Sequence, residues 1–75
     1  MLEEIKNILA DCANVDKSII NANSTLREDL NLDSLDCVEL LLELETFYDI
    51  HIAVDDMKDV NTVNDVMDLV NYKKN

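Results

Sequence analysis

The chain contains no glycine and no proline among its 75 residues. Glycine supplies the left-handed backbone of hairpin turns and of the loops that cradle phosphates, and proline fixes the backbone of many other turns. Hairpins and glycine-rich nucleotide loops are therefore disfavoured in this chain. We expect helices joined by turns that are rich in Asn and Asp, which tolerate left-handed backbone better than other residues with side chains.

The length suits one small domain, residues 1–75. A chain of this size buries only about 60% of its unfolded surface, so we expect marginal stability and no deep enclosed active site. Hydrophobic residues make up 48% of the chain, which is too many for a disordered acidic tail. No apolar run approaches the roughly 20 residues of a membrane span, and residues 1–4 lack the basic start of a signal peptide. We expect a cytoplasmic monomer.

The charge is strongly acidic and unevenly placed. The net charge is -11, and residues 28–59 hold eleven acidic residues against Lys58 alone, which is -10 of that total. Nucleic acids and anionic lipids attract clusters of Lys and Arg, so neither is an expected partner. A protein with a basic surface is the natural complement.

Apolar periodicity predicts two long helices in the first two thirds of the chain. The first runs over about residues 2–14 and stops at Asn14, and the second runs from Ser34 to Tyr48, with Ser34 or Asp33 as its cap. Between them lies a long loop, residues 15–32, whose isolated apolar residues are expected to anchor it to the core: Ile19, Ile20, Leu26, Leu30 and Leu32.

The remainder of the chain predicts one short and one long helix. A short turn of helix is expected around Asp55 to Lys58, and Thr62 with Asp65 resembles a capping box that starts the last helix. The apolar stripe of that helix is Val63, Val66, Met67 and Val70. The predicted fold is all-α, a small four-helix bundle with three main helices, one short helix and a long loop between the first two.

Helix 34–48 has more apolar surface than one core contact requires. At about 100° per residue, one face collects Cys37, Leu40, Leu41, Leu44 and Tyr48, which suffice for a core. The opposite side carries Leu35, Val38 and Leu42, flanked by Glu39, Glu45 and Thr46. Burial of the helix on both sides would explain this pattern, but unpaired carboxylates are costly to bury. We favour an exposed stripe that docks on a basic-rimmed apolar patch.

Ser34 has two interpretations on sequence alone. It is either an ordinary helix cap or an exposed hydroxyl beside free amides that would favour a phosphate ester, although Asp29, Asp33 and Asp36 would repel that anion. The two cysteines, Cys12 and Cys37, lie among apolar neighbours at helical spacing. We expect them to be small buried hydrophobic residues with reduced thiols.

Residues 26–36 resemble a known signature. They read Leu-Arg-Glu-Asp-Leu-Asn-Leu-Asp-Ser-Leu-Asp, are followed by Val38-Glu39-Leu40 and Glu45, and are similar to the core motif of acyl carrier proteins. The order of the predicted helices also resembles that family over nearly the whole chain. The resemblance implies that a phosphopantetheinyl transferase attaches 4'-phosphopantetheine from coenzyme A to Ser34, and that the arm carries acyl groups as thioesters.

The resemblance also implies roles for the rest of the signature. The protein would make no bonds itself and would have no catalytic residue of its own. It would deliver acyl intermediates to acyl-transferring and synthase enzymes of fatty-acid or polyketide synthesis, which would carry basic docking patches. The enzyme-facing residues would be Asp33, Leu35, Asp36, Val38, Glu39, Leu42 and Glu45. A growing chain would slip into the core lined by Leu40, Leu41, Leu44 and Tyr48.

Two departures from the family pattern are visible. The glycine usual in the loop just before the Asp-Ser-Leu motif is replaced by Asn31 and Leu32, and Asn31 can take over a left-handed position. A proline common before the short helix is also missing, with Ala53 and Val54 in that region. Both a housekeeping carrier and a specialised carrier are compatible with these changes.

Three other functions each match part of the sequence. Asp29, Asn31 and Asp33 alternate as in a calcium loop, but its sixth and twelfth positions are Ser34 and Leu40 instead of Gly and Glu, so we expect no metal site. A hydrolase built on Ser34 would need a base, and the only histidine is His51, in the next connection. The main alternative is an acidic helical adaptor that binds basic partners without a prosthetic group.

Overall fold

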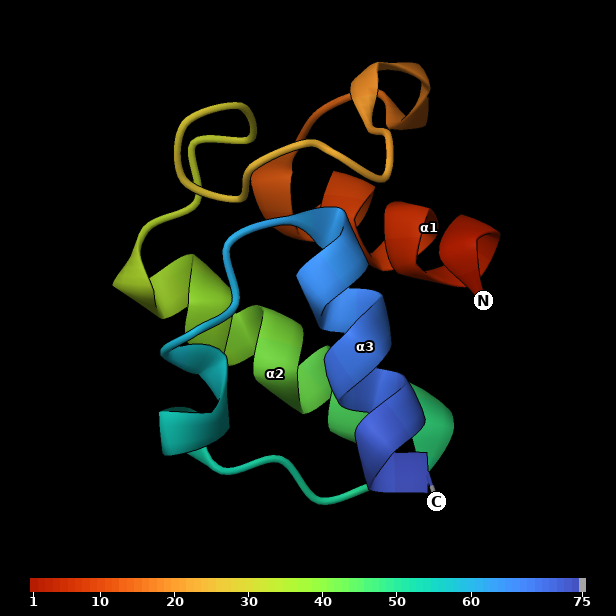
Figure 1. Ribbon diagram of the computed structural model, residues 1–75. Coiled ribbons are helices and arrows are strands. Elements are labelled where there is room, and N and C mark those ends of the chain that lie inside the picture. The colour runs from red at the N-terminus through yellow and green to blue at the C-terminus, as the bar shows by residue number, and fades with distance from the viewer. Residues whose placement is uncertain (75) are drawn as a thin grey trace.

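Three α-helices form the frame of the molecule in a computed structural model that describes residues 1–74 (Figure 1). They are α1 (Leu2–Ala13), α2 (Ser34–Tyr48) and α3 (Val63–Lys74). Two short 3-10 turns, η1 (Lys17–Ile19) and η2 (Val54–Met57), lie in the connections. Over the described residues, β structure is limited to one isolated bridge between Thr25 and Thr62. The all-α prediction is confirmed, and α2 has the bounds expected from its periodicity.

The short turn of helix expected around residues 55–58 is confirmed, as a single 3-10 turn that begins at Val54 and ends at Met57. One prediction about the connections was wrong. Ile19 does not anchor the loop to the core, because it lies on η1 and is 55% exposed. The Asp16 side chain accepts a hydrogen bond from the Ser18 N–H (2.9 Å) and so starts this turn at the surface. The adjacent Ile20 is buried instead.

Turns in this glycine-free chain use Asn and Asp, as expected. Among residues 1–74, positive φ values occur at Asn14 (56°), Asn31 (57°) and Asp49 (55°). Asn14 and Asp49 end α1 and α2, where a left-handed residue lets its N–H reach back to a helix carbonyl. Asn31 lies in the loop just before the Asp33-Ser34-Leu35 motif. The prediction that it takes over a left-handed position is confirmed.

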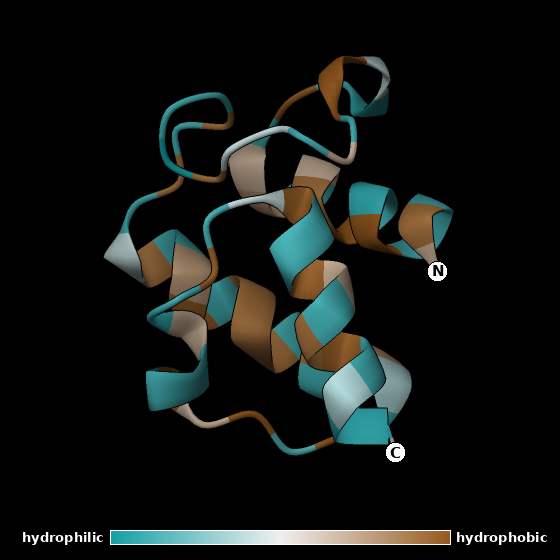
Figure 2. Ribbon diagram, in the orientation of Figure 1, coloured by the Kyte–Doolittle hydropathy of each residue, from teal (hydrophilic) through white to brown (hydrophobic). Residues whose placement is uncertain are grey.

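The core lies where the inner faces of the three helices meet, and α2 contacts α1, α3 and η2. Figure 2 shows hydrophobic residues concentrated along these inward faces. Helix α2 contributes Leu40, Leu41 and Leu44, and the expected stripe of α3 is buried except for the partly buried Met67. The other buried residues include Ile5 and Leu9 of α1 and Leu26, Leu30 and Leu32 of the long loop.

Backbone hydrogen bonds fasten the long loop to the segment that precedes α3. The Leu26 N–H donates to the Asn61 carbonyl (2.8 Å), and the Val63 N–H donates to the Ser24 carbonyl (3.0 Å). A further bond joins the Leu32 N–H to the Leu26 carbonyl (2.9 Å). The loop therefore approaches α2 along a fixed path. Within residues 1–74, no helix has the length and apolar character needed to cross a membrane.

Candidate functional site

The first turn of α2 is closed by a reciprocal capping box. The Asp33 Oδ1 accepts a hydrogen bond from the Asp36 N–H (2.9 Å), and the Asp36 Oδ2 accepts one from the Asp33 N–H (3.2 Å). Asp33 is therefore the cap, and Ser34 is the first residue of the helix. Ser34 is exposed, and its hydroxyl makes no hydrogen bond within residues 1–74. The cap interpretation of Ser34 is wrong because its neighbour already performs that function.

Asp29, a potential source of repulsion near Ser34, is engaged elsewhere. Its Oδ2 accepts a hydrogen bond from the Thr25 N–H (2.8 Å), and the Thr25 Oγ1 accepts one from the Asp29 N–H (3.1 Å). The Thr25 backbone bond, followed by the Thr25 hydroxyl, holds the pKa of Asp29 below its usual value. Of the three acids expected around Ser34, this one thus stabilises the loop.

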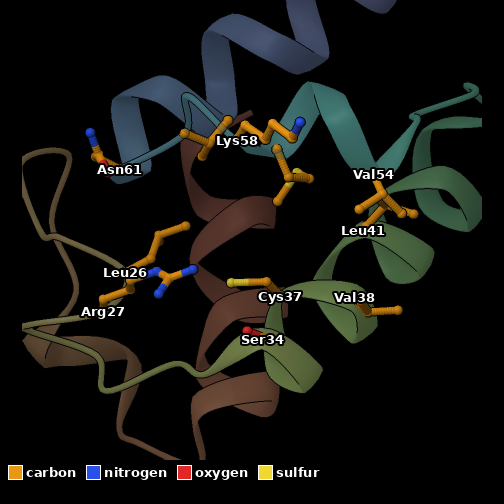
Figure 3. Close-up of a pocket in the computed structure, with 11 residues that line it drawn as sticks. Leu26, Arg27, Ser34, Cys37, Val38, Leu41, Val54, Lys58 and Asn61 are labelled. Atoms are coloured by element: carbon orange, nitrogen blue, oxygen red, sulfur yellow. The ribbon is translucent and has the colours of Figure 1, made fainter.

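Ser34 lies at a cleft of about 440 Å³ between α2, η2 and the long loop (Figure 3). Its lining is mainly apolar, with two cations and two neutral polar residues: Leu26, Arg27, Ser34, Cys37, Val38, Leu41, Val54, Met57, Lys58, Val60 and Asn61. The sequence did not reveal this cleft, since its walls come from three separate segments. Of the four residues expected to receive an acyl chain, only Leu41 is in the lining. Leu40 and Leu44 are fully buried, and Tyr48 is partly buried.

The cysteines are unpaired and only partly buried. Burial is the main cause that raises the pKa of the Cys12 thiol, to about 11. Burial also raises the pKa of Cys37, while the charge of Arg27 opposes that rise. Both thiols are therefore protonated at neutral pH and are weak nucleophiles. The prediction of free thiols is confirmed. The prediction that both cysteines are buried is wrong, because each is only partly buried.

The outer face of α2 exposes the predicted apolar stripe. Leu35 is 75% exposed and Leu42 54% exposed, and Val38 is also exposed, so burial of the helix on both sides is excluded. A shallow hollow of about 380 Å³ continues along this face, lined by Glu39, Leu42, Glu43, Thr46 and Phe47. Phe47 is 55% exposed. The helical wheel offered no reason to select it, because its position borders the core face.

Glu45 lies at the last turn of α2 and has a structural contact. Its Oε2 accepts a hydrogen bond from the Ile52 N–H (2.9 Å) and lies 3.3 Å from the His51 Nδ1. At a rise of about 1.5 Å per residue, the eleven positions between Ser34 and Glu45 span about 16 Å of helix. His51 is therefore beside the opposite end of α2 from Ser34. The two residues do not form a nucleophile and base pair.

Tyr48, at the same end of α2, ties that helix to α1. Its hydroxyl donates a hydrogen bond to the Glu4 Oε1 (3.0 Å). Burial and the Glu4 carboxylate raise the pKa of Tyr48 to about 12. Among the described residues, no group of three or more His, Cys, Asp and Glu side chains is placed to hold a metal ion. Ser34 thus combines an exposed hydroxyl with an apolar cleft on one side and an exposed helix face on the other.

Residues 3–70 match the family described as phosphopantetheine attachment site. The chain is 40% identical over 73 residues to the acyl carrier protein of Thermosynechococcus vestitus, covering 97% of this chain and 90% of that protein. It is 39% identical over 72 residues to the acyl carrier protein of Chlamydia felis, covering 96% of this chain and 92% of that protein.

Solved structures give the same result. The fold superposes with a TM-score of 0.79 on holo acyl carrier protein from Geobacter metallireducens, at 25% identity and with 96% of this chain and 83% of that chain covered. The fold and site thus define a small helical carrier domain. The chain belongs to the acyl carrier protein family, whose function is to carry acyl groups on a phosphopantetheine arm. The sequence resemblance is confirmed, and the adaptor without a prosthetic group is set aside.

Proposed function

We propose that Ser34 is the residue to which 4'-phosphopantetheine is attached. The observation that carries this assignment is its exposed hydroxyl, free of hydrogen bonds within residues 1–74 and located on the lining of the cleft. In the attachment reaction, the Ser34 Oγ would bond to the pantetheine-side phosphorus of coenzyme A, 3',5'-ADP would leave, and the serine proton would pass to the transferase. The arm supplies a terminal thiol that holds acyl groups as thioesters.

The cleft fits the attached group chemically. The apolar lining residues Leu41, Val54 and Met57 suit the hydrocarbon parts of the arm and its acyl group, and Asn61 adds a polar side chain to the lining. Neither cysteine would compete for acyl groups, because both thiols have raised pKa values. In this proposal the chain positions and shelters its cargo, and the enzymes that it visits make and break the bonds.

The outer face of α2 is the proposed docking surface, made of Asp33, Leu35, Asp36, Val38, Glu39, Leu42 and Glu45. Leu35, Val38 and Leu42 are exposed beside acidic side chains, which suits a basic-rimmed apolar patch on a transferase or synthase. Glu45 contributes least, because its carboxylate is only 23% exposed and bonds to Ile52. Fatty-acid synthesis enzymes are the proposed partners. The cytoplasmic location and the monomeric state stay predictions of the sequence.

Intact-mass analysis tests the attachment site. The wild-type chain is incubated with coenzyme A, Mg²⁺ and a phosphopantetheinyl transferase that is active on a control carrier protein. We expect the wild-type chain to gain the mass of one phosphopantetheinyl group and Ser34→Ala to gain none. Ser18→Ala removes another exposed serine hydroxyl and should load like the wild type. Loading of Ser34→Ala would refute the assignment, as would an unmodified wild-type chain.

A further inference from the structure

The charged residues that line the cleft beside Ser34 are positive, although the surrounding surface is acidic. Residues 28–59 carry -10 of the net -11, yet the two charged residues among the eleven that line the cleft are Arg27 and Lys58 (Figure 3). Neither charge is needed to build the hydrophobic core. A cationic lining in so acidic a region indicates that the cleft meets an anionic group.

Arg27 is the cation on the Ser34 side of the cleft. Its backbone position is fixed, because the preceding residue, Leu26, is buried and hydrogen-bonds through its N–H to Asn61. Figure 3 shows its guanidinium pointing into the cleft toward Cys37, near the start of α2. Cys37 follows Ser34 by three residues and so lies on the same side of the helix. The influence of Arg27 on the Cys37 pKa agrees with this proximity.

Arg27 is also available to a ligand. It is exposed and makes no ion pair with a carboxylate of residues 1–74. Lys58, in contrast, pairs with Asp55 (3.2 Å) and lies across the cleft at the end of η2. Arg27 is therefore the cation nearer to Ser34 and has no ion pair within residues 1–74, whereas Lys58 is farther away and is paired.

A phosphodiester on Ser34 would stand beside Asp33 and Asp36, both of which are acidic. A nearby positive charge would offset this repulsion. A guanidinium presents a planar fork of donors that matches two phosphate oxygens, which a compact ammonium does not. The free amides of the first turn of α2 add weaker support for an anion.

We propose that Arg27 binds the phosphodiester of the phosphopantetheine arm and directs the arm from Ser34 into the cleft. This inference rests on the proposed attachment at Ser34. It assigns Arg27 a positioning role that is separate from the acidic docking surface of α2. Arg27 would thereby bias the arm toward the sheltered side of Ser34 when no enzyme is docked.

The test compares loaded wild type with Arg27→Gln, using Lys58→Gln as the matched control that removes one positive charge from the same cleft. Loading is first verified by intact mass, so a wild-type chain that does not load refutes the attachment proposal instead. We expect the ³¹P resonance of the loaded protein to shift in Arg27→Gln and to stay near its wild-type position in Lys58→Gln. Identical ³¹P resonances in wild type and Arg27→Gln would overturn the inference, as would equal shifts in both variants.

A second measurement needs no variant. The Arg27 side-chain Nε–H signal of uniformly ¹⁵N-labelled wild type is recorded before and after loading. Binding of the phosphodiester should shift this signal and slow its exchange with water, and both effects should weaken at 1 M NaCl, where the Debye length is about 3 Å. An Arg27 signal that does not change on loading would contradict the proposal even if Arg27→Gln failed to fold or to load.

Discussion

Asp33 and Ser34 are adjacent polar residues with separate functions. Both residue types cap helices well, so the sequence alone left the choice open. The structure decides for Asp33, because Asp36 is three residues further on and returns the hydrogen bond to the Asp33 N–H. Ser34 therefore has no capping role, and its hydroxyl is available for the proposed attachment.

This division predicts opposite results for two neighbouring substitutions. Asp33→Ala removes the cap and should lower the free energy of unfolding by about 1 kcal/mol. Ser34→Ala removes a hydroxyl without a hydrogen-bond partner within residues 1–74, so its unfolding free energy should stay within about 0.5 kcal/mol of the wild type. Urea denaturation followed by circular dichroism measures both. A larger loss in Ser34→Ala than in Asp33→Ala would contradict the assignment of the cap.

The long helices could be predicted from the sequence, and the short connecting elements could not. Helix α2 has strong helix formers, a cap and a left-handed Asp49 at its end, so local and long-range signals agree. The η1 turn has three residues, too few for an apolar period to show which of Ile19 and Ile20 faces inward. The cleft depends on tertiary contacts that bring Leu26, Val54 and the start of α2 together. For that reason, the sequence indicated Ser34 as the candidate attachment residue but did not indicate the apolar cleft around it.

The start of α3 gives the fold a specific sensitivity to acid. The Asp65 Oδ2 accepts hydrogen bonds from the Asn61 N–H (2.9 Å) and the Thr62 N–H (3.1 Å), and the Thr62 Oγ1 accepts one from the Asp65 N–H (3.2 Å). The capping box predicted from the sequence is thus confirmed. The Asn61 and Thr62 backbone bonds hold the pKa of Asp65 below its usual value of 3.8.

The lowered pKa makes the contribution of Asp65 dependent on pH. Its ionised cap stabilises the fold above about pH 4, the carboxyl pKa of the unfolded chain, and this stabilisation is lost as the pH falls through the lower folded-state pKa. We expect the wild type to have a higher melting temperature than Asp65→Asn at pH 7. The difference between the two melting temperatures should narrow below pH 4. Asp68→Asn, which removes the same charge from an exposed position on α3, serves as the control. A gap that stays constant down to pH 2.5 would contradict this account.

The acidity of the whole molecule is a surface property concentrated around one element. The segment that holds most of the net charge comprises α2 and its flanking connections, with Leu35 and Leu42 exposed among its carboxylates. Charge that is arranged in this way speeds encounter with a basic partner, whereas evenly distributed charge would mainly increase self-repulsion. The distribution therefore carries more functional information than the total.

A charge reversal separates these two effects. Glu39→Lys on α2 and Asp68→Lys on α3 give the same net charge at different places. If α2 is the docking surface, Glu39→Lys should slow acyl transfer by a partner enzyme at low salt, and the loss should shrink at high salt because of screening. Asp68→Lys should transfer at nearly the wild-type rate. Transfer rates of loaded proteins at several salt concentrations give the result, and equal slowing by both variants would refute a localised docking surface.

The bridge between Thr25 and Thr62 bears on the order of folding. It joins residues 37 positions apart, so forming it requires closure of a long loop, which costs conformational entropy that the local hydrogen bonds within a helix do not. We expect the helices to form before these pairings. The neighbouring Leu26 and Asn61, which line the cleft and are joined by a backbone hydrogen bond, would then be among the last residues to reach their native positions. The cleft beside Ser34 would thus be completed late, after the helix that begins at Ser34 has formed.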